Sequence, residues 1–273
     1  MFVSVPRESV AAMLEKREIG FEPFDSRFGG CYNGRGLLIS GRKNSGKTAL
    51  GIRFLLAGLP KEEKGLILTS QSAQETLHCA DSMALPLRQA LADKNLLLVE
   101  YLKRKASGEG PGDPMIPPEG FLQLGEIIEA HGIRRVVIDT VLPWLLRPDS
   151  DRMSERILSL VRAFDRLAVT TLFTLPRPAS ESAREILGHL EYHVPVAATL
   201  EFNPPSPQRE FRVTKYLGIP TPPGASVFRI DDPQRESGVL NRTGGDSRTG
   251  TGGFAAVMKS RSFYLNPAGR SAP

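Results

Sequence analysis

The chain has 273 residues, enough for one large α/β domain, and its two cysteines, Cys31 and Cys79, cannot build a disulfide framework. No window approaches the ~20 apolar residues of a membrane span and the N-terminus lacks the apolar core of a signal peptide, so we expect a soluble, cytoplasmic protein without a membrane partner. The net charge is +5, and the segment from Asp232 onward, with six Lys/Arg and three Asp/Glu, carries +3 of it. The rest of the chain therefore carries only +2, which does not support electrostatic steering of the whole domain toward nucleic acid.

Short β-rich runs alternate with longer helical patterns along the chain, which is typical of βαβ units that build a parallel sheet. In chain order we expect a helical lead-in over residues 1–20, one α/β domain over 21–231 and a disordered Gly/Ser/Arg-rich tail over 232–273. Strands are expected at about 36–40, 65–70, 95–101, 134–139 and 169–174.

The clearest helical pattern runs from Ser154 to Leu167, with apolar residues at i, i+3 and i+4 spacing and with Asp149 or Ser150 as its cap. Residues 103–118 are too rich in Gly and Pro for a helix or strand, so they are expected to form a long loop. Two alternating runs within 197–218 predict a β-hairpin that closes the sheet in antiparallel fashion.

The stretch Gly41-Arg42-Lys43-Asn44-Ser45-Gly46-Lys47-Thr48 fits the phosphate-loop pattern at every defined position. In such a loop, backbone N–H groups and the N-terminus of the following helix point at phosphate oxygens. Lys47 would bridge the β- and γ-phosphates, and the Thr48 hydroxyl would bind Mg²⁺. The alternative is a glycine-rich turn that merely matches, but the position between a strand and a helix favours the functional interpretation. The expected nucleotide-binding residues are Gly41, Asn44, Ser45, Gly46, Lys47, Thr48 and Ala49.

The stretch Arg134-Arg135-Val136-Val137-Ile138-Asp139 predicts a buried strand that delivers a carboxylate to the C-terminal edge of the sheet. There Asp139 would hold a Mg²⁺-bound water beside Thr48. Taken alone, an Asp at a strand end is often only a helix cap. The order of the two motifs favours a nucleotide site.

At these residues the chain resembles the RecA-like ATPases, and within them the KaiC-like group, from about Phe21 to Gly218. The resemblance includes "FGGCYNGRGLLISG", "ALGIRFLLAG", "KGLILTS", "GIRRVVIDTVLPWL" and "REFRVTKYLG". It implies a RecA-like core with a mostly parallel sheet flanked by helices and a C-terminal antiparallel hairpin. It also implies ATP with Mg²⁺ and a homo-oligomer, a ring or filament with sites between subunits.

Two departures from the family pattern affect catalysis. Where the resemblance places a pair of glutamates after the second strand, one of which orients the attacking water, this chain has Gln71 and Ser72. Glu75 lies one helical turn further on as a substitute catalytic candidate, although a carboxylate at the start of a helix is its simpler interpretation. Where the family often carries Lys-x-Arg that reaches a neighbour's γ-phosphate, this chain keeps Lys215 but has Leu217.

The rate factors that such groups usually contribute indicate how far hydrolysis should be weakened. A trans-acting arginine is worth roughly 10³–10⁵ in rate, and a positioned general base about 10²–10⁴. The leading hypothesis is therefore an ATP-binding protein with weakened hydrolysis, whose nucleotide controls assembly or signalling. The first alternative is a competent ATPase that uses Glu75 or a partner's residue.

A second alternative is a DNA-binding recombination accessory protein of the same fold. Arg177, Arg184, His189 and His193 cluster after the fifth strand, but acidic residues alternate with them, so a solvated helix face is favoured over nucleic acid. The tail contains one apolar cluster, Phe263-Tyr264-Leu265, which offers a docking segment for a protein partner; the alternative is an extension without a specific role.

Overall fold

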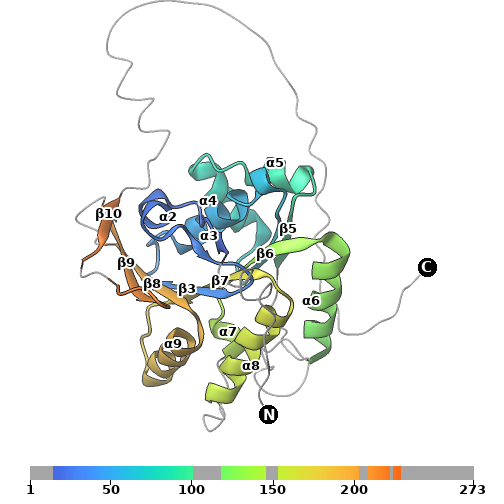
Figure 1. Ribbon diagram of the computed structural model, residues 1–273. Coiled ribbons are helices and arrows are strands. Elements are labelled where there is room, and N and C mark those ends of the chain that lie inside the picture. The colour runs from blue at the N-terminus through green and yellow to red at the C-terminus, as the bar shows by residue number, and fades with distance from the viewer. Residues whose placement is uncertain (1–14, 101–117, 146–152, 203–207, 222–223, 229–273) are drawn as a thin grey trace, which may run out of the picture.

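The computed structural model describes residues 15–100, 118–145, 153–202, 208–221 and 224–228. An eight-stranded sheet in the order β10-β9-β8-β3-β7-β6-β4-β5 runs through the middle of the molecule (Figure 1). Its parallel part consists of β3 (Gly36–Gly41), β4 (Lys64–Thr69), β5 (Leu96–Glu100), β6 (Ile133–Asp139), β7 (Thr170–Pro176) and β8 (Val196–Phe202). All five strands expected from the β-rich runs are confirmed.

The predicted hairpin is also confirmed, because β9 (Arg209–Tyr216) pairs antiparallel with β8. The edge strand β10 (Ser226–Phe228) then pairs antiparallel with β9. Three residues are too few to show an alternating pattern, so the sequence gives no signal for β10. The mostly parallel sheet with its antiparallel end is the RecA-like core that the sequence predicts.

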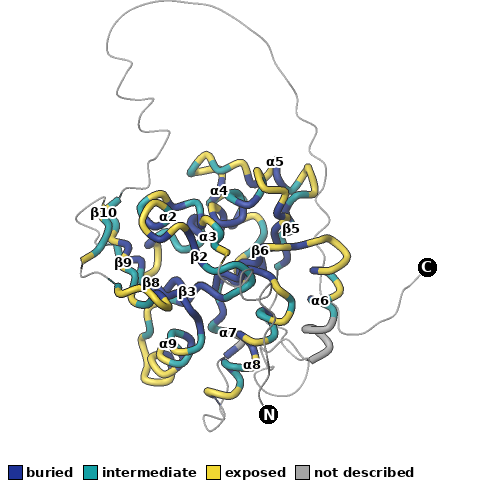
Figure 2. The backbone as a smooth tube through the Cα atoms, viewed as in Figure 1, coloured by how far each residue is buried: buried dark blue, intermediate teal, exposed yellow. Residues whose placement is uncertain are grey.

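Helices cover both faces of the sheet (Figure 1). On one face lie α2 (Glu22–Phe28), α3 (Lys47–Leu56), the short η1 (Leu59–Lys61), α4 (Ala73–Ser82) and α5 (Leu87–Ala92). On the other lie α6 (Pro118–His131), α7 (Leu142–Leu145), α8 (Met153–Arg166) and α9 (Glu181–His193). Each face has its own cluster of buried apolar side chains, and the strands between them are the most buried part of the chain (Figure 2). Parallel strands covered on both sides explain why β3 and β6 are nearly continuous apolar runs.

Some local predictions need correction or fall outside the described residues. Residues 15–20 hold strand β1 (Lys16–Arg17), which pairs antiparallel with β2 (Cys31–Tyr32), instead of a helix. The rest of the lead-in, the tail from 229 onward and the caps Asp149 and Ser150 lie outside the described residues. The predicted loop 103–118 does too, except that Pro118 begins α6. No helix in the described ranges is long and apolar enough to cross a membrane.

Candidate functional site

The phosphate loop connects the end of β3 to the start of α3 and has the backbone of an anion cradle. Asn44 and Gly46 have positive φ values of 61° and 105°, a conformation that helps turn successive N–H groups toward one side. A side chain at Gly41 would collide with the carbonyl oxygen of Leu200 in the adjacent strand β8, so only glycine fits there. The Ser45 side chain is fully buried, and its hydroxyl has no hydrogen-bond partner among the described residues.

The Lys47 side chain folds over the loop that precedes it. Its Nζ donates hydrogen bonds to the carbonyl oxygens of Gly41 and Arg42 at 2.9 and 2.7 Å. Burial lowers the pKa of Lys47, and the nearby carboxylates of Asp139 and Glu201 oppose that shift. A cation is thus held over the loop, where a phosphate chain would compete with the two carbonyl groups for it.

Asp139 at the end of β6 is bonded to α3, to β7 and to the residue after β4. Its Oδ2 accepts a hydrogen bond from Thr48 Oγ1 at 2.7 Å, and its Oδ1 accepts one from Thr174 Oγ1 of β7 at 2.6 Å. Its backbone oxygen accepts from the N–H of Ser70, just after β4, at 2.9 Å. The sequence predicted the meeting of Thr48 and Asp139, whereas Thr174 was missed. Carboxylate and hydroxyl oxygens are the donors that Mg²⁺ prefers, so this pair fits the metal.

A cavity of about 950 Å³ opens over these groups. Five of the seven predicted nucleotide-binding residues line it: Asn44, Gly46, Lys47, Thr48 and Ala49. At the strand ends, its lining includes Asp139, Thr140 and Thr174. Helix α4 contributes His78, Cys79 and Asp81. Gln71 and, from β9, Arg209 also line it. The α4 residues and Arg209 were not predicted from the sequence. The size and lining suit a ligand that combines a polar phosphate chain with a larger body.

Glu75, one of the two predicted catalytic residues, is engaged elsewhere. Ser72 Oγ accepts a hydrogen bond from the Glu75 N–H at 3.1 Å, and Glu75 Oε2 accepts one from the Ser72 N–H at 3.0 Å, a capping box at the start of α4. Its side chain does not belong to the lining of the cavity. A catalytic role for Glu75 would therefore require this cap to break.

Lys215, the other predicted catalytic residue, also lies away from the cavity of its own chain. Its Nζ donates to the carbonyl oxygens of Glu191 and Tyr192 at the end of α9, at 2.7 Å each. In the sheet Lys215 is opposite Ala197, near the start of β8, whereas the phosphate loop follows the end of β3. Any contribution to phosphate chemistry would therefore be made to another copy.

Charged side chains surround the phosphate loop at the neighbouring strand ends. Glu201 follows Leu200, the register partner of Gly41, and lies 3.6 Å from Arg42 and 3.7 Å from Arg177. All three side chains are between 37% and 56% exposed, so the ion pairs add little to stability. They set the local potential instead, because Glu201 acts electrostatically on Lys47.

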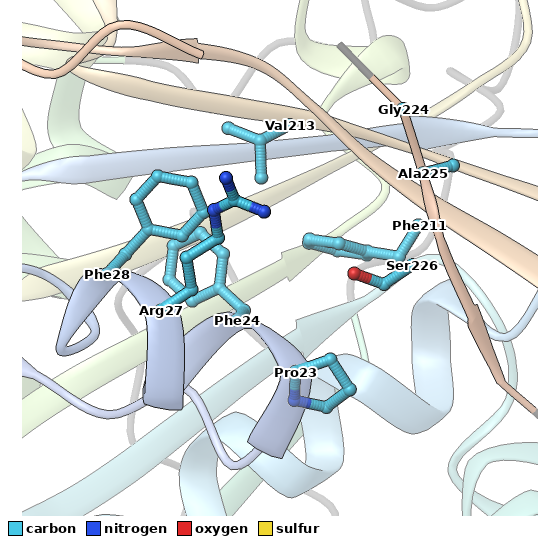
Figure 3. Close-up of a pocket in the computed structure, with 9 residues that line it drawn as sticks. All are labelled: Pro23, Phe24, Arg27, Phe28, Phe211, Val213, Gly224, Ala225 and Ser226. Atoms are coloured by element: carbon cyan, nitrogen blue, oxygen red, sulfur yellow. The ribbon is translucent and has the colours of Figure 1, made fainter. Parts of the chain in front are cut away.

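A second hollow of about 110 Å³ lies between α2 and the edge strands. In Figure 3, Phe24, Arg27 and Phe28 of α2 face Phe211 and Val213 of β9 across it. The rings of Phe24 and Phe211 are 5.9 Å apart in an edge-on arrangement, so aromatic packing fixes α2 against the sheet. With about a ninth of the volume of the larger cavity, it is too small to hold a nucleotide.

His189 and His193 stand four residues apart on α9, a spacing that can bind a metal ion. Within the described ranges there is no group of three or more His, Cys, Asp or Glu side chains arranged to hold a metal ion. Burial is the main cause that lowers the pKa of His193, and the charge of His189 acts in the same direction.

A strand that ends in a glycine-rich loop, a helix that begins with Lys-Thr, and a hydroxyl–carboxylate contact to a second strand define a phosphate-loop ATPase domain with a RecA-like core. The family model described as "ATPase: KaiC" matches residues 18–236. The chain therefore belongs to the KaiC ATPase family.

Curated relatives agree with this family. The chain is 29% identical over 140 residues to the circadian clock protein KaiC2 of Synechocystis sp., which covers 49% of this chain and 24% of that protein. It is 29% identical to the circadian clock oscillator protein KaiC 1 of the same organism, over 63% of this chain and 33% of the relative. It is also 29% identical to the circadian clock oscillator protein KaiC of Thermostichus vulcanus, over 64% and 34%. The match thus spans about a third or less of each relative's length.

Proposed function

We propose that this protein binds ATP with Mg²⁺ in the 950 Å³ cavity, hydrolyses it slowly, and uses the bound nucleotide to control assembly or a signalling conformation. The observation that carries the proposal is the 2.7 Å hydrogen bond between Thr48 and Asp139. Two residues that are 91 positions apart in the sequence meet at the open side of the phosphate loop, with oxygen donors suited to a hard cation.

Each part of the site has a role in holding the ligand. The loop's N–H groups and Lys47 would bind the phosphate oxygens, and Thr48 and Asp139 would hold Mg²⁺ and its waters. The metal, when bound, supplies positive charge that neutralises the phosphate chain. Thr174 positions Asp139 through the hydrogen bond to Oδ1, which leaves Oδ2 directed at Thr48.

Slow hydrolysis is expected because the chain lacks catalytic side chains at three positions where the family resemblance places them. Gln71 and Ser72 stand where glutamates are expected, and Leu217 stands in place of an arginine. Leu217 is 56% exposed, so it offers a neighbour an apolar side chain instead of a cation. Ground-state binding is expected to remain, because the phosphate loop, Lys47, Thr48 and Asp139 are all present.

We expect the purified protein to turn over ATP at roughly 10⁻⁴ to 10⁻² s⁻¹, the range of phosphate-loop GTPases that act without a partner's arginine. A steady-state ATPase assay would be run beside size-exclusion of the same samples with ATP, with ADP and without nucleotide. A larger assembly with ATP and slow turnover would support the proposal. Turnover above about 1 s⁻¹ without any partner would contradict slow hydrolysis. An elution volume that is the same in all three samples would argue against control of assembly.

The DNA-binding alternative has its own test in the same samples. A basic contact surface would bind single-stranded DNA with an affinity that falls steeply as salt rises. We expect no such binding, because Arg42 and Arg177 are already paired with Glu201 beside the loop. Tight, salt-dependent binding would favour the recombination accessory function.

Glu201→Gln is expected to increase ATP affinity by up to about fivefold, which corresponds to about 1 kcal/mol. The change removes a negative charge that acts on Lys47 and releases Arg42 and Arg177 from their ion pairs. An ATP titration of both proteins measures the difference. Glu185→Gln, an exposed residue of α9, removes the same charge elsewhere and serves as the control. Weaker binding by Glu201→Gln would show that the carboxylate supports the site.

A further inference from the structure

The turn between β4 and α4 places Gln71 in the nucleotide cavity and keeps Glu75 out of it. Gln71 lines the same cavity as Lys47, Thr48 and Asp139. Neither Ser72 nor Glu75 is part of that lining, although all three lie within five residues of one another. Among Gln71, Ser72 and Glu75, Gln71 is therefore the one that the structure brings to the site.

The backbone of this turn is fixed by hydrogen bonds, which makes the placement of Gln71 a property of the fold. Four consecutive N–H groups each have an acceptor within 3.1 Å. In order from Ser70 to Ala73, the acceptors are the Asp139 backbone oxygen, Thr69 Oγ1, Glu75 Oε2 and Glu100 Oε2. The residue before Gln71 is thus bonded directly to the residue that would hold the metal.

Moving the Glu75 side chain into the cavity would break its capping hydrogen bonds and cost free energy. Its carboxylate accepts the Ser72 N–H, and its own N–H donates to Ser72 Oγ. Breaking such a cap destabilises a helix start by ~1 kcal/mol. The same movement would leave the Ser72 N–H without an acceptor in the turn that positions Gln71.

We infer that Gln71 is the side chain that orients the water for ATP hydrolysis, and that its amide chemistry sets the low rate; the inference rests on the proposed function. A primary amide accepts a hydrogen bond from water through Oε1 and donates two through Nε2, so it can align water. The glutamine of Ras-type GTPases has this role. An amide orients the nucleophile but does not remove its proton as a glutamate would.

The reaction balances without a protein base. The water oxygen forms a bond to the γ-phosphorus, the bond from that phosphorus to the bridging oxygen breaks, and ADP leaves with the electron pair. The proton of the water passes to a phosphate oxygen, while Gln71 accepts a hydrogen bond throughout. The products are ADP and inorganic phosphate.

Gln71→Glu tests the inference as a gain of function. A positioned general base adds about 10²–10⁴ to a rate, so we expect turnover to rise at least about tenfold even without the missing arginine. ATP affinity is measured for every variant and is expected to change no more than about fivefold. Gln71→Ala is expected to lower the residual rate by about tenfold, with ATP still bound.

Two neighbouring substitutions provide matched controls. Gln74→Glu makes the same chemical change at an exposed position of α4 outside the cavity lining, and its turnover should match the wild type. Glu75→Gln removes the alternative base but keeps the cap, since glutamine also closes a capping box.

A Gln71→Glu protein that binds ATP but turns it over no faster than the wild type would overturn the inference. So would loss of turnover in Glu75→Gln, which would assign the water to Glu75. Failure of the wild type to bind ATP would overturn the inference and the proposed function together, and the affinity measurements identify that case separately.

Discussion

Lys47→Ala is expected to weaken ATP binding by roughly 100-fold, or about 3 kcal/mol, because hydrogen bonds to charged groups contribute about 1.5–3 kcal/mol each. The ammonium lies over the loop in contact with the Gly41 and Arg42 carbonyls, where phosphate oxygens would bind it. An ATP titration of both proteins by calorimetry measures the change.

Lys64→Ala is the matched control for this substitution. It removes one positive charge at the exposed start of β4, whereas the nucleotide site lies at the ends of the parallel strands. ATP affinity within about twofold of the wild type is expected, because exposed charges at that distance are screened by salt. Equal losses in the two variants would mean that net charge, and not the phosphate loop, governs binding.

Arg135→Ala is expected to lower the free energy of unfolding by about 3–5 kcal/mol. The Arg135 side chain is 1% exposed in β6 and forms an ion pair with Glu63 at 2.6 Å. It also donates to the carbonyl oxygens of Phe54 and Glu18 at 2.8 and 2.6 Å, and its guanidinium lies 4.9 Å from the Phe54 ring. Its removal leaves buried acceptors without their donor and opens a cavity.

Urea denaturation of Arg135→Ala and Arg134→Ala measures this effect. Arg134 is the preceding residue of β6 and is exposed, so its substitution is expected to change stability by less than about 0.5 kcal/mol. Similar urea midpoints for the two variants would contradict this account. They would show that the contacts of Arg135 with Glu63, Glu18 and Phe54 do not stabilise the packing of these residues against the sheet.

The sequence predicted the features that depend on local patterns. The phosphate loop lies within eight consecutive residues, and the apolar run before Asp139 identified β6. Thr48 and Asp139 were paired from the motif order alone, and the 2.7 Å hydrogen bond between their side chains confirms that they meet. Each of these two signals lies next to a predicted strand, which is why sequence order could bring them together.

The features that were missed depend on which strands are neighbours. Thr174 contacts Asp139 because β7 lies beside β6, and Arg209 reaches the cavity from β9, which follows the end of β8. Arg134 and Arg135 look alike in the sequence, yet within the described part of the chain it is Arg135 that pairs with a carboxylate, that of Glu63, 72 residues away. Spacing along the chain gives no signal for such contacts.

The most direct test of the central claim is a calorimetric titration of ATP into the wild-type protein, with Mg²⁺ and with a chelator in its place. We expect one nucleotide per chain, a Kd in the micromolar range (about −8 kcal/mol), and at least about tenfold tighter binding with Mg²⁺. No binding at millimolar ATP, or an affinity that does not respond to Mg²⁺, would contradict a site built from Lys47, Thr48 and Asp139.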